Sequence, residues 1–219
     1  HASDFAHTTR SIVLTKLRRF LTFNDAKDAE LTDAIANALL LKAMEQQASG
    51  QADQADATLI QLADFLRATL QLSGRQQVPL RTELHLLHAY AALMLARFGE
   101  RVAIQWQVDD AALDCAVPVM SLQPLLENIF KHTVEQNRQK TGISILIQRS
   151  PEGGLQMQLA DDRGRLAVST TPGVGLNNLR QRLQVLYGNG ASLQLTQLEP
   201  AGVLAELRLP WNTDADTDR

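Results

Sequence analysis

Short runs in which apolar and polar residues alternate fill much of the second half of the chain. These runs are Val102–Val108, Ile143–Gln148, Leu155–Leu159, Leu193–Thr196 and Val203–Leu209. A period of two is typical of strands with one buried face. Segments with helical periodicity lie among them, namely Pro79–Phe98, Leu122–His132 and a helix from about Leu176 to Leu186. Strands and helices mixed in this order predict an α/β sandwich with helices on one face of the sheet.

The chain has a different character before Val78. Between Leu31 and Leu72 there is no proline, only Gly50 interrupts, and alanine and leucine dominate. This favours two helices joined near residues 48–52. An apolar stripe on the second helix comprises Leu59, Leu62, Ala63, Leu66 and Leu70. Because one hairpin is too small to bury a stable core, we expect two copies to form a four-helix bundle, and hence a homodimer. The predicted fold class is α+β, a helical hairpin followed by an α/β sandwich.

The helix Leu122–His132 carries a polar cluster formed by Glu127, Asn128, Lys131 and His132. Their spacing places them within one helical turn of each other, so they can face one ligand. An asparagine oxygen is a suitable ligand for magnesium, a glutamate can orient or deprotonate a nucleophile, and a lysine attracts phosphate. The alternative is an ordinary solvated face of an amphipathic helix.

A glycine-rich turn precedes the last predicted helix. Gly173 and Gly175 permit a tight backbone turn, and the helix that begins near Leu176 directs unpaired N–H groups toward whatever binds there. Asn178 follows on the same helix. Such a turn suits phosphate, although for these glycines alone a loop between strand and helix is the simpler explanation.

Together the two segments, LQPLLENIFKH and GVGLNNLRQRL, resemble motifs of LytS-like sensor histidine kinases. These kinases are part of the wider superfamily of gyrase, chaperone, histidine-kinase and mismatch-repair ATPases, and the similarity extends from Val78 to Pro210. The family's asparagine box reads LQPLVENAIKHG and its second glycine box GxGLxNxRxRL. The resemblance implies Mg²⁺ and ATP as cofactors. It also implies that Asn128 binds magnesium, that Glu127 assists phosphoryl transfer, that Lys131 contacts phosphate, and that Gly173, Gly175 and Leu176 line the nucleotide lid.

The family's adenine-binding motif, DNGxG, is only partly matched. The strand Leu155–Leu159 leads to Asp161, which by the resemblance hydrogen-bonds the adenine amino group, but Arg163 and Arg165 stand where the family has glycines. Gly164 is then expected to take over part of the turn. The alternative is that the two aspartates merely cap a strand.

The phosphoacceptor motif of the family, LxxQINPHFLFNxLN, has diverged in this chain. Aligned with Leu31–Glu45, it places Ala38 at the position of the acceptor histidine. Alanine has no nucleophilic lone pair, so we expect no autophosphorylation there. His85 and His88 lie one helical turn apart and offer an alternative acceptor or zinc site; two partly exposed histidines without such a role are the simpler interpretation.

The resemblance divides the chain into four parts. These are a signalling or linker helix (1–30), a dimerisation and phosphotransfer-like hairpin (31–76), an ATP-binding catalytic domain (77–211) and a flexible tail (212–219). In residues 10–23, basic side chains stand beside apolar ones, which fits either an amphipathic helix just inside a membrane or a packing helix of the dimer.

Composition limits the remaining function classes. The net charge of −3 argues against a nucleic-acid binder, and Cys115, the only cysteine, points to a reducing compartment. No run of about 18 apolar residues exists, so a membrane would be reached only through segments absent from this chain. We expect a soluble, cytoplasmic chain that in the full-length protein lies at the cytoplasmic face of the inner membrane.

Three functions remain open. The first is the cytoplasmic part of a two-component sensor histidine kinase that acts on a response regulator. The second is a pseudokinase that signals by binding nucleotide or a second kinase. The third is an ATPase of the gyrase or mismatch-repair type, which the helical hairpin before the ATP domain disfavours.

Overall fold

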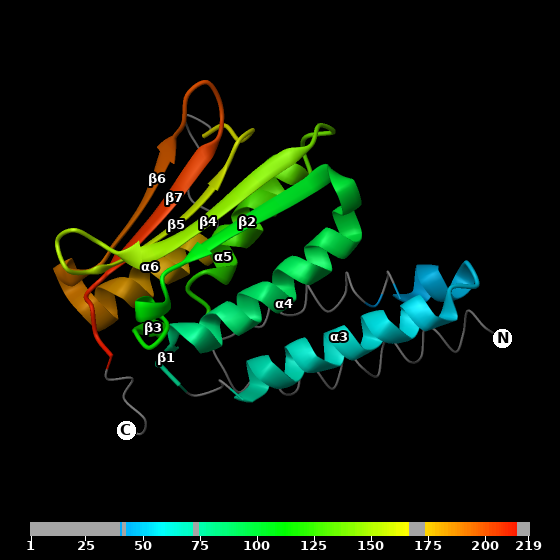
Figure 1. Ribbon diagram of the computed structural model, residues 1–219, viewed down its shortest axis with the longest axis horizontal. Helices are drawn as coiled ribbons and strands as arrows, with labels where there is room; N and C mark the ends of the chain where they lie inside the picture. Colours follow the sequence, from blue (N-terminus) through cyan, green and yellow to red (C-terminus); the bar gives the residue numbers. More distant parts are fainter. Residues whose placement is uncertain (1–39, 41–42, 72–74, 167–173, 214–219) are drawn as a thin grey trace. The chain divides into compact units, whose positions relative to one another are not determined.

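The alternating runs in the second half of the chain form a five-stranded sheet, as predicted. The computed structural model describes residues 40, 43–71, 75–166 and 174–213. The strands are β2 (Val102–Val108), β4 (Thr141–Arg149), β5 (Leu155–Asp161), β6 (Ser192–Gln197) and β7 (Val203–Leu209). Their order across the sheet is β2-β4-β5-β7-β6 (Figure 1). The pair β2–β4 is parallel, and the other neighbouring pairs are antiparallel.

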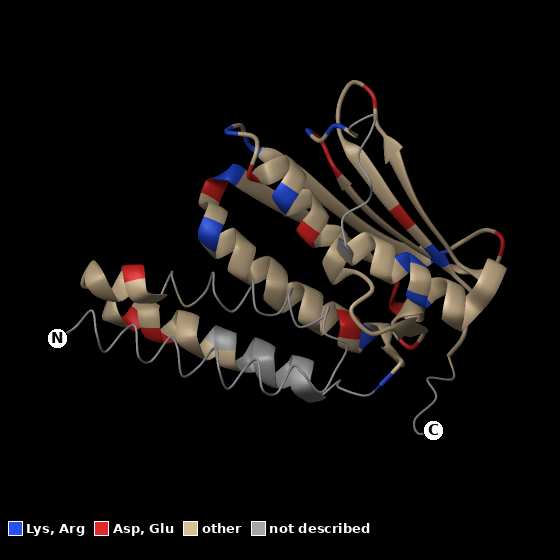
Figure 2. Cartoon of the chain, turned by 180° about the vertical axis from the view of Figure 1, so that it is seen from behind, with Lys and Arg blue, Asp and Glu red and all other residues tan. Residues whose placement is uncertain are grey.

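Helices cover one face of this sheet (Figure 2). They are α4 (Leu80–Phe98), α5 (Gln123–Ile129) and α6 (Val174–Tyr187). Short 3₁₀ turns follow α4 and α6, at Gly99–Arg101 and Gly188–Gly190, and another spans Asp110–Ala112. A small antiparallel pair of β1 (Gln77–Pro79) and β3 (Ala116–Pro118) flanks α4. The predicted layers, a sheet with helices on one face, are therefore confirmed.

Alternation decides which side chains meet the helices. In β4 the buried side chains are Ile143, Ile145 and Ile147, and in β5 they are Leu155, Met157 and Leu159. Leu125, Leu126 and Ile129 of α5 and Leu176, Leu179 and Leu183 of α6 are buried as well. Because successive strand residues point to opposite faces, one face of the sheet is left polar.

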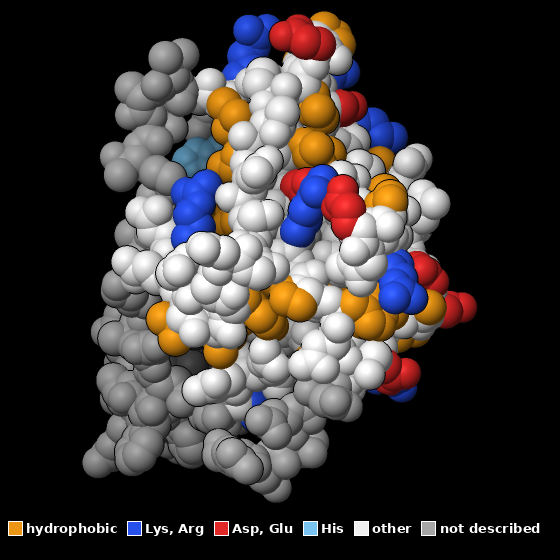
Figure 3. All heavy atoms as spheres, turned by 90° about the vertical axis from the view of Figure 1, so that its left-hand side faces the viewer, with side chains coloured by type: hydrophobic (Ala, Val, Ile, Leu, Met, Phe, Trp, Pro, Cys, Tyr) orange, Lys and Arg blue, Asp and Glu red, His pale blue; other side chains and the backbone are white. Residues whose placement is uncertain are grey.

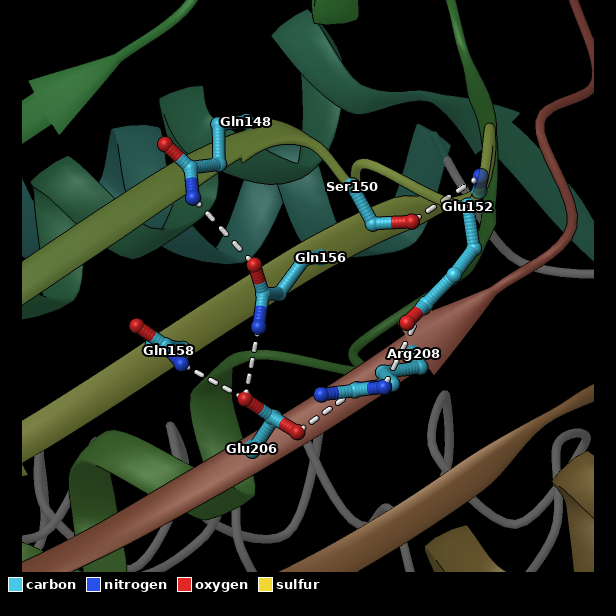
Figure 4. Close-up of polar contacts among 8 residues, drawn as sticks. Gln148, Ser150, Glu152, Gln156, Gln158, Glu206 and Arg208 are labelled. Atoms are coloured by element: carbon cyan, nitrogen blue, oxygen red, sulfur yellow. Dashed lines mark hydrogen bonds and ion pairs between the residues drawn. The ribbon is translucent and has the colours of Figure 1, made fainter.

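The polar face carries a hydrogen-bonded ladder across three strands (Figure 4). Gln148 of β4 donates to Gln156 of β5 at 3.2 Å, and Gln156 donates to Glu206 of β7 at 2.7 Å. Gln158 and Arg208 also donate to Glu206. Burial opposes ionisation of Glu206, but these hydrogen bonds outweigh it and lower its pKa. The polar side chains of this ladder therefore satisfy one another on the face of the sheet away from the helices.

The chain divides into two compact units, His1–Gly74 and Arg75–Arg219. In the first unit, residues 43–48 are helical, Gly50 has a positive φ of 75°, and α3 (Ala52–Gln71) follows. The Thr58 hydroxyl donates to the side-chain oxygen of Gln46 at 2.8 Å across this turn. The described residues thus contain the turn and the second helix of the predicted hairpin, together with the end of its first helix. Its homodimer stays a prediction, and residues 1–39 and 214–219, with the predicted signalling helix and Ala38, lie outside the described residues.

Charges of both signs are interspersed on the face that Figure 3 presents, with small groups of hydrophobic side chains between them. This face shows no extended basic patch of the kind that binds polyanions. Within the described ranges, no helix is long and apolar enough to cross a membrane.

The first testable prediction concerns Gly202, in the turn between β6 and β7. Its φ is 115°, and a Cβ there would overlap the backbone carbonyl of Asp161. We expect Gly202→Ala to lower the free energy of unfolding by at least about 2 kcal/mol, because backbone strain and a steric clash add. Urea denaturation measures this.

Gly153→Ala is the matched control. Gly153 has a φ of 92°, but a Cβ would meet no heavy atom within 4 Å. Strain alone should cost about 1 kcal/mol there. Equal losses in the two variants would show that the clash at Gly202 is not real.

Candidate nucleotide-binding site

The polar cluster predicted on the helix Leu122–His132 lies where α5 gives way to a wider turn. Pro124 stands in the first turn of α5, a favourable position for proline, and regular helix ends at Ile129. Phe130–Val134 then form a π-helical turn, in which the Glu135 N–H reaches back to the carbonyl of Phe130 at 2.9 Å. The helix predicted over Leu122–His132 is thus present, but its last part is a wider π turn rather than regular α-helix. Such π turns often occur at functional sites.

The wider turn divides the cluster into two pairs. Glu127 and Asn128 are half-buried residues of α5, whereas Lys131 and His132 are exposed residues of the π turn. Arg101, which follows α4, donates to the carbonyls of Val134 and Asn137 and so satisfies backbone acceptors beyond the turn.

Glu127 is electrostatically unusual. Burial raises its pKa, the positive charge of Lys131 lowers it in part, and the negative charge of Glu135 raises it further. A carboxylate that holds its proton more tightly than usual is a stronger base when ionised. Glu127 is therefore suited to accept or orient a proton, the role that the sequence suggested.

Asp161 ends β5 and is only 3% exposed. One carboxylate oxygen accepts the backbone N–H groups of Arg163, at 2.9 Å, and of Gly164. The other oxygen accepts the hydroxyl of Thr133 at 3.3 Å. Since Thr133 belongs to the π turn, this contact joins the asparagine box to the turn after β5. The structure thus brings these two predicted elements together.

The neighbouring Asp162 has a different role. Its carboxylate accepts the backbone N–H of Gly142 at 2.9 Å, and its own N–H donates to the Gly142 carbonyl. Strand capping, the alternative considered for both aspartates, therefore applies to Asp162. Asp161 also caps the turn after β5 through its hydrogen bonds with Arg163 and Gly164, and its role toward adenine stays a prediction.

Arg163 and Arg165 do not disrupt the turn. Arg163 lies at the surface, 3.8 Å from Asp162, and Arg165 is exposed. The position in the turn that has no room for a side chain is Gly164. A Cβ there would come within 2.8 Å of both Asp161 carboxylate oxygens and 2.7 Å of the Thr133 hydroxyl. Gly164 is therefore the residue that must lack a side chain, as expected.

The second glycine box is only partly within the described residues. Gly173 lies outside them. Gly175 is in the first turn of α6, where a Cβ would lie 3.7 Å from Pro124 of α5, so the starts of the two helices adjoin. Leu176 is buried and Asn178 half-buried. Leu176 contributes to the core, and the place in the nucleotide lid that the resemblance implies for it stays a prediction.

Sequence reasoning missed Glu83, a buried acid of α4 that is 1% exposed. Its carboxylate accepts the backbone N–H groups of Met120 at 2.8 Å and Leu122 at 2.9 Å, just before α5. Arg182 of α6 donates to the Met120 carbonyl at 3.1 Å. Burial raises the pKa of Glu83, and these hydrogen bonds and Arg182 oppose that rise. The sequence pattern that could have revealed Glu83 is an acidic residue on the apolar face of the predicted helix Pro79–Phe98.

His85 and His88 show no sign of a zinc site. His88 stacks on Trp106 with ring centroids 3.8 Å apart, and burial followed by the neighbouring His85 lowers its pKa. Among the residues with described positions, no group of three histidine, cysteine or acidic side chains could hold a metal.

The sheet has five strands and carries α4, α5 and α6 on one face. The asparagine box meets the adenine-binding motif at Asp161, through Thr133. This arrangement is that of a histidine-kinase type of ATPase fold. The chain superposes on the histidine kinase domain of the blue-light activated histidine kinase EL346 from Erythrobacter litoralis with a TM-score of 0.53. That match covers 94% of this chain and 99% of that domain at 17% identity, and it bears on the fold alone.

Sequence comparison gives the narrower relationship. The sequence model of the histidine kinase family matches residues 35–102. The sensor protein LytS of Oceanobacillus iheyensis is 29% identical over 73% of this chain, and the sensor histidine kinase YpdA of Escherichia coli 28% identical over 70%. The chain is thus a relative of the LytS-like sensor histidine kinases. It spans only 30% and 28% of the length of these two proteins.

The raised pKa of Glu127 predicts a pH-dependent stability difference. The Glu127 carboxyl binds its proton more tightly in the folded protein than in the unfolded chain, where its pKa is near 4.5. The free energy of unfolding therefore falls as the pH rises from about 4.5 through the pKa of Glu127 in the folded state. Glutamine does not ionise. We therefore expect Glu127→Gln to have a higher melting temperature than the wild type at about pH 8, and this difference in melting temperature to be smaller at about pH 4.

Calorimetric melting of both proteins across this pH range is the measurement. A stability difference that stays constant between the two pH values would contradict the effect of burial on the Glu127 carboxyl.

Proposed function

We propose that the chain is the nucleotide-binding catalytic part of a two-component sensor histidine kinase. The observation that supports this most strongly is the buried Asp161 carboxylate, which the asparagine-box residue Thr133 and the turn N–H groups hold at the end of β5. A carboxylate kept in place by three donors suits recognition of an adenine amino group. The similarity to LytS and YpdA supports the same assignment.

The residues of α5 fit a magnesium nucleotide. Asn128 offers an amide oxygen and Glu127 a half-buried carboxylate, both oxygen donors of the kind that magnesium accepts. Lys131, exposed on the π turn, supplies positive charge for phosphate. Bound Mg²⁺ would neutralise the phosphates of ATP. His132, Gly173, Gly175 and Asn178 are proposed to complete the nucleotide site.

Ala38 favours a second candidate, a pseudokinase. Because alanine offers no acceptor, the chain would signal by binding nucleotide or a partner without autophosphorylation. The two candidates share the nucleotide site and differ in whether the chain transfers a phosphoryl group.

The proposed partners follow from the proposed function. The hairpin in residues 31–76 would form a homodimer, residues 77–211 would act as the catalytic domain, and a response regulator would receive the signal. The full-length protein would work at the cytoplasmic face of the inner membrane, anchored by segments outside this chain. We propose no nucleic-acid partner.

Titration calorimetry with magnesium and a non-hydrolysable ATP analogue tests the site. We expect saturable binding to the wild type and at least about ten-fold weaker binding to Asn128→Ala, because the variant loses the proposed metal ligand. Asn137→Ala, a residue beyond the π turn, is the matched control and should bind like the wild type. Absence of binding to the wild type at millimolar nucleotide would refute the nucleotide site.

Phosphorylation tests whether this chain carries a phosphoacceptor of its own. Incubated alone with radiolabelled ATP, the chain should gain no acid-labile, base-stable label, because Ala38 cannot accept phosphate. The stability of the label in acid and base is the readout. Label with phosphohistidine character would contradict this expectation and point to another histidine, and His85→Asn and His88→Asn would then identify it.

A further inference from the structure

The side chain of Gln197, the last residue of β6, joins the hairpin β6–β7 to the turn after Asp161. Its amide nitrogen donates to the carbonyls of Gly202 at 2.8 Å, Leu198 at 3.2 Å and Gly164 at 3.3 Å. Its amide oxygen accepts the N–H of Leu166 at 2.8 Å. The Gln197 residue is exposed as a whole, yet its amide has partners on two separate segments of backbone.

One residue, Gly164, connects this attachment to Asp161. The Gly164 carbonyl accepts from Gln197 and also from the Gly202 N–H at 2.9 Å, while the Gly164 N–H donates to the Asp161 carboxylate. The Asp161 carboxylate is therefore anchored to the hairpin through a single residue of the turn.

This arrangement explains how the turn tolerates Arg163 and Arg165. Neither side chain holds the backbone of the turn. The turn is fixed from the hairpin side instead, by the Gln197 amide and by the close approach of Gly202 to the Asp161 backbone.

We propose that Gln197 is a positioning residue that makes this site select adenine over guanine. The inference rests on the proposed function and deepens it. Gln197 contacts neither base nor phosphate in this proposal; it acts by fixing the turn that aims Asp161.

The chemistry follows from the acceptor count of the carboxylate. An ionised carboxylate has about four acceptor positions, and Thr133, Arg163 and Gly164 occupy three of them. The remaining position can bind only a donor. A purine held with its C6 substituent toward this position presents an amino group if it is adenine and a carbonyl, which a carboxylate repels, if it is guanine. If the turn loosens, the carboxylate can reorient and this discrimination weakens.

Two variants of Gln197 test the proposal. Gln197→Leu removes every hydrogen bond of the amide. Gln197→Glu keeps an acceptor for Leu166 but places an oxygen where the amide nitrogen now faces three carbonyl oxygens, so it should disturb the turn more. Gln194→Leu is the matched control, since Gln194 is exposed on the same strand. Affinities for the non-hydrolysable ATP and GTP analogues are measured with magnesium, with Asn128→Ala as the baseline.

We expect Gln197→Leu to bind the ATP analogue about ten-fold more weakly and to lose most of the preference over the GTP analogue. Gln197→Glu should be affected at least as strongly, and Gln194→Leu should match the wild type. Backbone hydrogen exchange at Gly164 and Leu166 should become faster in both Gln197 variants, while thermal midpoints stay close to that of the wild type.

The outcomes distinguish this inference from the proposed function. If the wild type binds the ATP analogue, Asn128→Ala does not, and both Gln197 variants keep the affinity and base preference of the wild type, the role of Gln197 is wrong and the nucleotide site stands. Weaker binding of both analogues by the same factor would also overturn the role in selectivity. If the wild type binds neither analogue, both proposals fall together.

Discussion

The buried carboxylate of Glu83 is the interaction on which the arrangement of the site depends. An unpaired charge in the interior is strongly unfavourable, so this side chain requires donors. The N–H groups of Met120 and Leu122 supply them, and Arg182 binds the Met120 carbonyl from the other side. Met120 has a φ of 54°, uncommon for a residue other than glycine. Glu83 and Arg182 thus hold a strained segment that fixes where α5 begins.

The turn at Asp161 is likewise built from several elements. Its carboxylate takes donors from the π turn and from its own turn, and the hairpin β6–β7 supports that turn through Gln197 and Gly202. The asparagine box, the end of β5 and the hairpin therefore form one connected unit. A change in any of them alters the hydrogen bonds of the Asp161 carboxylate, because the hydrogen bonds of a network in a low dielectric strengthen one another.

Sequence reasoning located the strands well, because each has one buried face and the alternation is visible directly. It placed Asp161 at the end of β5 and anticipated that Gly164 would take over the turn. It did not anticipate that the asparagine-box helix widens into a π turn at Phe130–Val134, a turn whose last carbonyl accepts a hydrogen bond from the distant Arg101. It assigned no role to Gln197, because an exposed glutamine at a strand end has no pattern that predicts four backbone partners.

The sequence by itself determined the layers of the fold and the position of the two motifs. These depend on periodicity and residue chemistry, which are local properties. The tertiary structure decided which groups complete the site: Thr133 and Gly164 on Asp161, and Gln197 on the turn behind them. It also showed that Glu83 is an internal anchor. The physical reason is that these contacts join residues far apart in the chain, and only the packing of the sheet and helices brings their polar atoms within hydrogen-bonding distance.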